Sequence, residues 1–147
     1  MVLVHKMTYL NKNDIKATIT PLPYSPCFKD QYTKLYNTCY HKMREALNIK
    51  PYDFIQDDTF FEKDMDKVHL LTDGDYLIGS VTLKGSEIDD LLVDPKYQGR
   101  GYGRKLLLWA LENISSDNIT LHVADWNQRA IALYKSVGFE ITETFEA

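Results

Sequence analysis

A glycine-rich, cationic stretch is the part of the chain best suited to chemistry. It reads VDPKYQGRGYGRKLL, from Val93 to Leu107, and sets three glycines beside four lysine or arginine side chains. Glycine weakens a helix and like charges repel, so a helix that starts this way is unfavourable on its own. The N–H groups at a helix start bind anions, and glycine lets a ligand come close to the backbone. The stretch therefore predicts a phosphate or pyrophosphate site at the start of a helix.

Two common phosphate-binding loops do not fit this stretch. A P-loop needs the pattern G-x-x-x-x-G-K-[ST], which the sequence lacks. A dinucleotide loop needs G-x-G-x-x-G, and counting from Gly99 puts Arg104 where the third glycine should stand. Asp94 and Pro95 also make the connection longer than the tight turn of a Rossmann fold. Both interpretations fail on spacing.

The pattern that does fit is Q-x-x-G-x-G, made by Gln98, Gly101 and Gly103 after a segment that reads LLVDP. A second segment, NQRAIALYKSVGF at 127–139, has the form N-x-x-A-x-x-x-Y-x-x-x-G-F. Together the two motifs resemble the GNAT superfamily, the acyl-coenzyme A-dependent N-acyltransferases. The resemblance covers 87–139, and the first sixty residues carry no motif of the family.

This resemblance implies a site for acetyl-CoA as cosubstrate. The strand 87–93 would separate from the strand 119–123, which frees backbone groups for the pantetheine arm, while the glycine-rich loop would hold the pyrophosphate. Asn127 would bond the pantetheine, although an asparagine there also suits a helix N-cap. The implied cofactor-binding residues are Leu91, Leu92, Val93, Gln98, Gly99, Arg100, Gly101, Tyr102, Gly103, Arg104 and Asn127.

Acyl transfer to an amine also needs groups that move protons. By resemblance, Tyr134 faces the thioester sulfur and protonates the departing thiolate, since a tyrosine of ordinary pKa, about 10, is protonated at pH 7. A core aromatic that only packs is the alternative for this residue.

Two residues are candidates for the base that takes the amine proton. Glu87 lies six residues before Val93, where the histone acetyltransferases of the family place a catalytic glutamate. His122 lies five residues before Asn127, where ribosomal-protein acetyltransferases carry a glutamate, and an imidazole suits proton removal near neutral pH. Strand alternation would put Glu87 on one face with positions 89, 91 and 93 and turn Asp90 to the other face, in a structural role. A surface carboxylate and an ordinary strand histidine are the alternatives.

The apolar patterns predict the elements that hold these residues. Strands are expected at 15–20, 67–72, 76–83, 87–93, 119–123 and 139–145. Helices are expected at 29–47, at 57–63 with Asp57 or Asp58 as its cap, after the glycine-rich loop, and at 127–136 before Gly138. The order is βααβββαβαβ, in which an antiparallel meander leads into a βαβ unit. We therefore expect an α/β (α+β) fold in one domain over residues 1–147, with a mixed, mostly antiparallel sheet and helices on both faces.

The composition of the chain restricts the kinds of molecule that it is expected to bind. Apolar residues make up 44% of the chain and charged residues 26%, with a formal charge of −4, so nucleic acid is not an expected partner. No apolar run reaches the roughly 20 residues of a membrane helix, and the first residues lack the apolar core of a signal peptide. We interpret Cys27 and Cys39 as reduced thiols of a cytoplasmic protein. His5, His41 and His69 share no ligand spacing, so no metal is expected.

Two functions follow from these observations. The first is an N-acetyltransferase that moves an acetyl group from acetyl-CoA to a primary amine of a small molecule or peptide, by direct transfer in a ternary complex. The second is a CoA-binding module without catalysis, acting as a sensor or partner protein. Tyr134 favours the enzyme, because a binder has no use for a proton donor there. The acceptor amine is not identified by the sequence, and a homodimer stays open.

Overall fold

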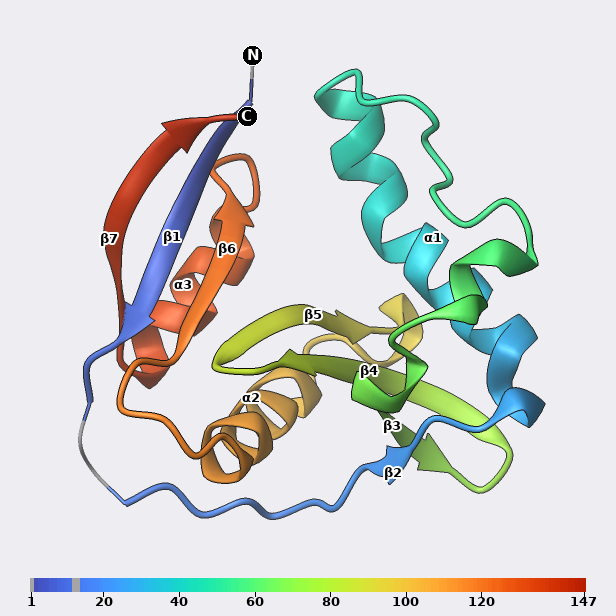
Figure 1. The fold of residues 1–147 in the computed structure, drawn as a ribbon, viewed down its shortest axis with the longest axis horizontal. Helices are drawn as coiled ribbons and strands as arrows, with labels where there is room; N and C mark the ends of the chain where they lie inside the picture. The colour runs from blue at the N-terminus through green and yellow to red at the C-terminus, as the bar shows by residue number, and fades with distance from the viewer. Residues whose placement is uncertain (1, 12–13) are drawn as a thin grey trace.

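The computed structural model describes residues 2–11 and 14–147, whose strands form one seven-stranded sheet. The sheet order is β2-β3-β4-β5-β6-β1-β7, and every neighbouring pair is antiparallel except β5 and β6 (Figure 1). This confirms the expected fold class. The elements are β1 (Leu3–Tyr9), β2 (Leu22–Pro23), α1 (Lys29–Ala46), β3 (Val68–Asp73), β4 (Tyr76–Lys84), β5 (Glu87–Val93), α2 (Tyr102–Asn113), β6 (Thr120–Ala124), α3 (Gln128–Val137) and β7 (Phe139–Glu146).

The first strand of the chain lies elsewhere than predicted. The strand predicted at 15–20 is wrong, because this segment pairs with no neighbour, although Ile15 and Ile19 do pack against the core. The apolar and polar residues of this segment alternate because one side of it packs against the core, and not because it is hydrogen-bonded to another strand. The true first strand is β1, which lies between β6 and β7 and is antiparallel to both. Its buried side chains, His5 and Met7, alternate as a strand requires.

Local turn and cap signals predict the other elements well. Asp57 caps a 3-10 helix, Asp58–Glu62, by accepting a hydrogen bond from the Thr59 N–H at 2.9 Å. The second predicted helix is therefore this single 3-10 turn. Gly74 has φ 59° in the β3–β4 hairpin, and Gly138 has φ 126° at the end of α3, both as expected.

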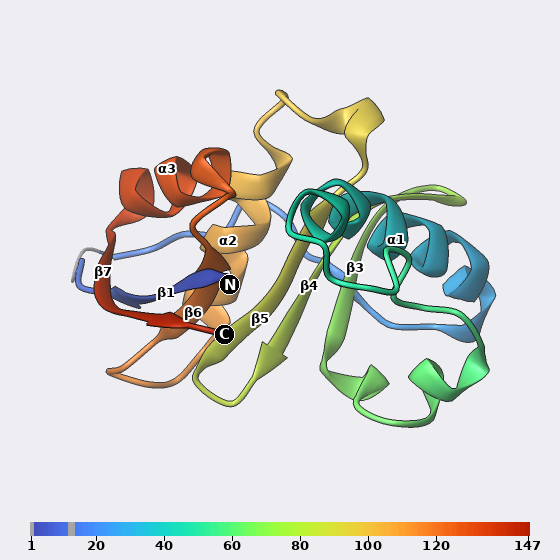
Figure 2. The ribbon, with the colours of Figure 1, turned by 90° about the horizontal axis from the view of Figure 1, so that it is seen from above.

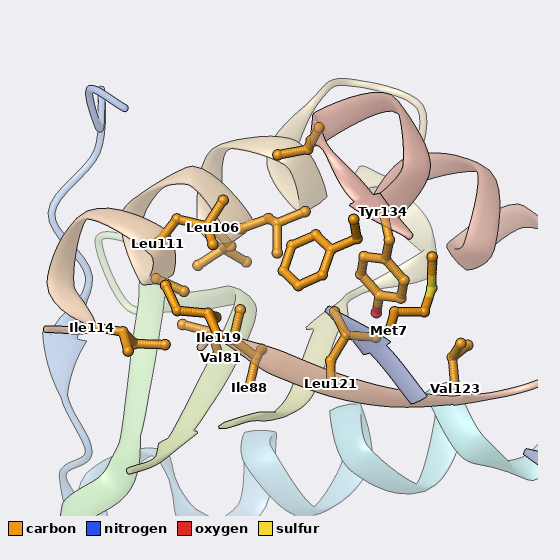
Figure 3. Close-up of a cluster of buried hydrophobic side chains, with 14 of the residues drawn as sticks. Met7, Val81, Ile88, Leu106, Leu111, Ile114, Ile119, Leu121, Val123 and Tyr134 are labelled. Carbon is orange, nitrogen blue, oxygen red and sulfur yellow. The ribbon is translucent and has the colours of Figure 1, made fainter. Parts of the chain in front are cut away.

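Two hydrophobic cores lie on opposite faces of the sheet. Figure 2 shows α3 beside β1 and β7, and α1 beside β3 and β4. The core under α2 and α3 is aliphatic with two aromatic rings, and Figure 3 shows part of it, including Leu106, Leu121 and Tyr134. The core under α1 contains Tyr32, Leu35, Ile55, Val68, Leu70, Leu77 and Leu92, with further aromatic rings around it. None of the helices described is long and apolar enough to cross a membrane.

A β-bulge in β5 separates side chains that simple alternation would put on one face. Val81 pairs with Leu91 and Leu83 pairs with Ile88, so two steps along β4 face three along β5. Ile88 consequently belongs to the core under α2 and α3, and Leu92 to the core under α1. The prediction that Glu87 shares a face with positions 91 and 93 is therefore wrong, since the extra residue reverses the alternation.

Candidate active site

The site lies where β5 and β6 diverge. The two strands pair only at Glu87↔Thr120 and Ile88↔Leu121, and then separate (Figure 1). Beyond this point the Asp94 N–H donates to the Ile78 carbonyl of β4 at 2.8 Å. Alternation therefore turns the Val93 amide to the opposite side, into the gap. Such a strand edge can bond an extended ligand, as the sequence predicts for the segment 91–93.

The glycine-rich loop ends in an open cradle at the start of α2. Gly99 has φ 79° and Gly101 has φ 85°, values that favour glycine, and a Cβ at either position would meet nothing within 4 Å. Gly101 is the N-cap of α2 and supplies no capping side chain. The first hydrogen bond of the helix runs from the Lys105 N–H to the Gly101 carbonyl, so the N–H groups of 102–104 precede it. These donors suit an anion.

Gly103 faces another helix. A Cβ there would lie 3.4 Å from Leu133 Cδ2 and 3.8 Å from Val93 Cγ2, within ordinary van der Waals contact. Its small size therefore serves the approach of α2 to α3, while its N–H stays with the cradle. A bulky residue at 103 would therefore press against Leu133 and disturb the packing of α2 on α3.

Cationic side chains surround the cradle and are held by local contacts. The Arg100 guanidinium lies over the Tyr97 ring at 5.5 Å, and the Lys105 ammonium lies over the Tyr102 ring at 5.5 Å. Arg104 donates to the Ser136 hydroxyl at 2.7 Å. These contacts leave the charges at the surface, where they add to the attraction for phosphate.

Gln98 and Asn127 are both engaged within the protein. The Gln98 side chain donates to the Val93 carbonyl at 3.2 Å and accepts from Arg129 at 3.2 Å, so it ties the loop to the end of β5. Asn127 Oδ1 accepts from the Ala130 N–H at 3.2 Å, as the N-cap of α3. Its Nδ2 donates to none of the residues described, and so it can still serve a ligand.

Tyr134 points from α3 toward the sheet with a free hydroxyl (Figure 3). Only 9% of the residue is exposed, and its ring packs edge-on against Phe139 at 6.1 Å. Burial, with a smaller contribution from the charge of Asp90, raises the pKa of Tyr134 to about 12. Within 2–11 and 14–147 the hydroxyl makes no hydrogen bond. A buried tyrosine usually bonds its hydroxyl, so this donor is available for a ligand.

The two predicted candidates for the base are bonded to each other. Glu87 Oε1 lies 2.8 Å from His122 Nδ1, beside the short paired part of β5 and β6. The side chains are 36% and 40% exposed, and the His122 ring lies 5.8 Å from Phe145. The structure therefore joins the rivals into one solvent-facing pair at the closed end of the gap.

A partly buried carboxylate lies further along β5. Asp90, at the bulge, accepts a hydrogen bond from the Tyr40 hydroxyl of α1. Burial, above all, raises the pKa of Asp90 to about 6, and the charge of Asp89 adds to it. Burial raises the pKa of Tyr36 and of Tyr134, and the negative charge of Asp90 adds to both shifts. Asp90 is therefore bonded to one tyrosine of α1, and its charge influences others on α1 and α3.

A sequence comparison identifies the family. The profile described as "Acetyltransferase (GNAT) family" matches residues 29–139, which is more than half of the chain. The chain belongs to the GNAT acetyltransferase family. Members of this family use acetyl-CoA as cosubstrate, and no cluster of metal-ligating side chains occurs in the described part of this GNAT domain.

Individual relatives match parts of this GNAT chain. The "Peptidyl-lysine N-acetyltransferase YjaB" of Salmonella typhimurium is 35% identical over 72 residues, covering 49% of this chain and 48% of that protein. The "N-alpha-acetyltransferase RimI" of Mycobacterium tuberculosis is 46% identical over 54 residues, covering 37% and 34%. The chain thus spans about half, or less, of the length of these relatives.

A solved structure shares the GNAT fold. An N-acetyltransferase from Staphylococcus aureus superposes with a TM-score of 0.67 at 15% identity, over 87% of this chain and 94% of that one. The residues of the gap fit the GNAT cosubstrate on two observations of their own. The cradle at Gly99 and Gly101 is open where a Cβ would otherwise stand, and β5 has an unpaired edge beside it.

Sequence reasoning did not foresee the contact of Asp90 with α1. Asp90 was expected to have a structural role, and the structure bonds it to the Tyr40 hydroxyl beside the gap. The available signal was a carboxylate pair, Asp89 and Asp90, inside an otherwise apolar strand. A charged residue there is unfavourable unless it is paired or used.

Proposed function

We propose that this protein is an N-acetyltransferase that transfers the acetyl group of acetyl-CoA directly to a primary amine in a ternary complex. The N–H groups of 99–104 would hold the pyrophosphate, and the free edge of β5 at Leu91, Leu92 and Val93 would hold the pantetheine arm. Asn127 Nδ2 would add a donor to the pantetheine. The cosubstrate supplies the thioester carbonyl that the amine attacks.

The free hydroxyl of Tyr134 is the observation that carries this proposal. Its pKa of about 12 keeps it protonated at neutral pH, and no described residue accepts its proton. Such a group is prepared to donate to the sulfur as the C–S bond breaks. A module that only bound CoA could use this ring for packing but would not need its hydroxyl.

Primary amines are the proposed acceptor class. The relatives are named for peptidyl-lysine, N-alpha and thialysine N-epsilon acetylation, and each name denotes a primary amine. Glu87 and His122 remain candidates for the base as one pair. If the pair acts, Glu87 would fix the Nδ1 proton and leave Nε2 of His122 to accept a proton. We place the enzyme in the cytoplasm, where Cys27 and Cys39, both free, would stay reduced.

Thiol release tests the proposal. The protein is mixed with acetyl-CoA and a panel of primary amines, and free CoA is followed together with the mass of the acetylated amine. Tyr134→Phe, which keeps the ring, should lower kcat by about 10²–10⁴-fold if thiolate departure limits the rate. Its affinity for CoA should be unchanged in calorimetry. Stabilisation by CoA without thiol release from any amine would favour the binding module instead.

A further inference from the structure

The charged groups of the site differ in what they contact. The Glu87–His122 pair lies at the closed end of the gap with its side chains 36% and 40% exposed, whereas the partly buried Asp90 is bonded to Tyr40 of α1. We propose that Asp90, rather than the Glu87–His122 pair, receives the proton of the acceptor amine. This inference rests on the proposed function and names the proton acceptor of the same site.

The β5 bulge puts Asp90 at the point where the reactants would meet. The bulge lies between Ile88, the last residue paired with β6, and Leu91, the first residue of the proposed pantetheine edge. Asp90 therefore comes directly before the free backbone, on the α1 side of the sheet. The Tyr40 hydroxyl donates to one carboxylate oxygen, Oδ1, and the side chain of Asp89 interacts with Asp90 from the same strand.

The surroundings of Asp90 suit proton exchange with an amine. Tyr40 bonds to Asp90 from α1, and the charge of Asp90 also acts on Tyr32 and Tyr36 of α1 and on Tyr134 of α3. Asp89 on β5 and Lys84 on β4 are the other charged groups, and they bond to each other at 3.1 Å.

These surroundings also explain why the pKa of Asp90 is raised. Burial raises its pKa to about 6, while the hydrogen bond from Tyr40 opposes this effect. A base that titrates near the working pH is more effective than an ordinary carboxylate. Asp90 would then be the group that accepts a proton, and Tyr134 the group that donates one.

The transfer step balances with these two groups. The acceptor enters as an ammonium and gives one proton to Asp90, which passes it to solvent. The neutral nitrogen then forms a bond to the thioester carbonyl carbon, the C–S bond breaks, and Tyr134 protonates the sulfur. The second nitrogen proton returns through water to the Tyr134 phenolate. Ammonium and thioester thus become amide, thiol and one released proton, and an acceptor that is already neutral does not need the first step.

The test compares Asp90→Asn with the matched control Asp89→Asn. Asn at 90 keeps the shape of the side chain and the acceptor for Tyr40. Asp89 is the neighbouring carboxylate, which pairs with Lys84 and whose charge adds to the effect of burial on the pKa of Asp90. Each variant is assayed with an alkylamine, which is mostly protonated at pH 7, and with hydroxylamine, which is mostly neutral. Asp90→Asn should lower kcat/KM for the alkylamine by about 10²–10⁴-fold and for hydroxylamine by less than about 10-fold. Asp89→Asn should change both by less than about threefold above pH 7, where Asp90 is ionised with or without this neighbour.

A pH profile separates this role from a structural one. In the wild type, kcat/KM should rise through an inflection near pH 6 that Asp90→Asn removes. Tyr40→Phe should move it to higher pH, because the lost hydrogen bond no longer stabilises the carboxylate. Equal losses with both amines, or an inflection kept in Asp90→Asn and lost in Glu87→Gln or His122→Gln, would overturn the inference. No thiol release by the wild type would overturn the proposed function itself.

Discussion

Asp90→Asn should make the protein more stable at pH 8 while it disables catalysis. In the folded protein the pKa of Asp90 is about 6, against an ordinary value of 3.8. The difference corresponds to about 3 kcal/mol by which folding disfavours the ionised carboxylate at pH 8. Asparagine carries no charge and can still accept the Tyr40 hydrogen bond. Burial of its amide offsets part of the gain, so we expect the free energy of unfolding to rise by about 1–3 kcal/mol.

The sign of the pH dependence makes this prediction specific. The folded state holds the Asp90 proton more tightly than the unfolded chain, so this group lowers wild-type stability as pH rises from about 4 through about 6. The difference in the free energy of unfolding between Asp90→Asn and the wild type should therefore be largest at pH 8 and close to zero at pH 4. Urea unfolding of the wild type, Asp90→Asn and Asp89→Asn at pH 4, 6 and 8 measures it. Asp89 forms an exposed ion pair with Lys84, so its variant should differ by less than about 1 kcal/mol.

Two results would refute the reasoning. One is an Asp90→Asn protein that is less stable than the wild type at pH 8, which would mean that the carboxylate is not disfavoured by burial. The other is the same stability difference at pH 4 and pH 8, which would show that the effect does not come from ionisation. If Asp90→Asn gains stability and loses activity, it will show the trade-off between stability and activity that is common at active sites.

Three further predictions concern the cosubstrate and the sheet. CoA at about 100 times its dissociation constant should add roughly 2.7 kcal/mol of stability, seen as a higher melting temperature, whereas NAD should add none. Gly101→Ala and Gly85→Ala should lower the free energy of unfolding by similar amounts, because both glycines have positive φ with open space around them. Only Gly101→Ala should weaken CoA binding in calorimetry. Equal affinities of the two variants for CoA would refute the role of Gly101 in binding the pyrophosphate. Gly79→Ala should destabilise the protein by about 1–3 kcal/mol in urea, since the added Cβ would lie 2.5 Å from the Leu92 carbonyl oxygen; an unchanged midpoint would show that β4 and β5 can move apart freely.

Features set by neighbours in sequence could be predicted from the sequence. The Asp57 cap, the Gly74 hairpin and the Gly138 helix end all depend on one or two residues and their backbone angles. The two motifs likewise located the cradle and Tyr134, because each motif lies within one loop or one helix. These predictions needed no knowledge of which strands pair.

Features set by distant pairing could not be predicted. β1 and the segment 15–20 both alternate, and only the strands contributed by the last third of the chain decide that β1 is the one that pairs. The bulge depends on the register between β4 and β5, so the position of Asp90 could not be read from alternation. The Glu87–His122 pair likewise joins residues 35 apart, which two independent motif comparisons treated as rivals.

The place of β1 between β6 and β7 also governs the order of assembly. His5 bonds to Thr144 at 2.8 Å and to Asp125 at 2.7 Å, contacts that span 139 and 120 residues. β1 precedes the other strands of this sheet in the sequence, yet both of its partners follow residue 119. β1 must therefore wait until β6 and β7 have been synthesised, and closing so long a loop slows folding. β1 is thus fixed in the sheet later than the local β3–β4 hairpin, and β6, one side of the active-site gap, has its outer neighbour only when segments more than 100 residues apart have met.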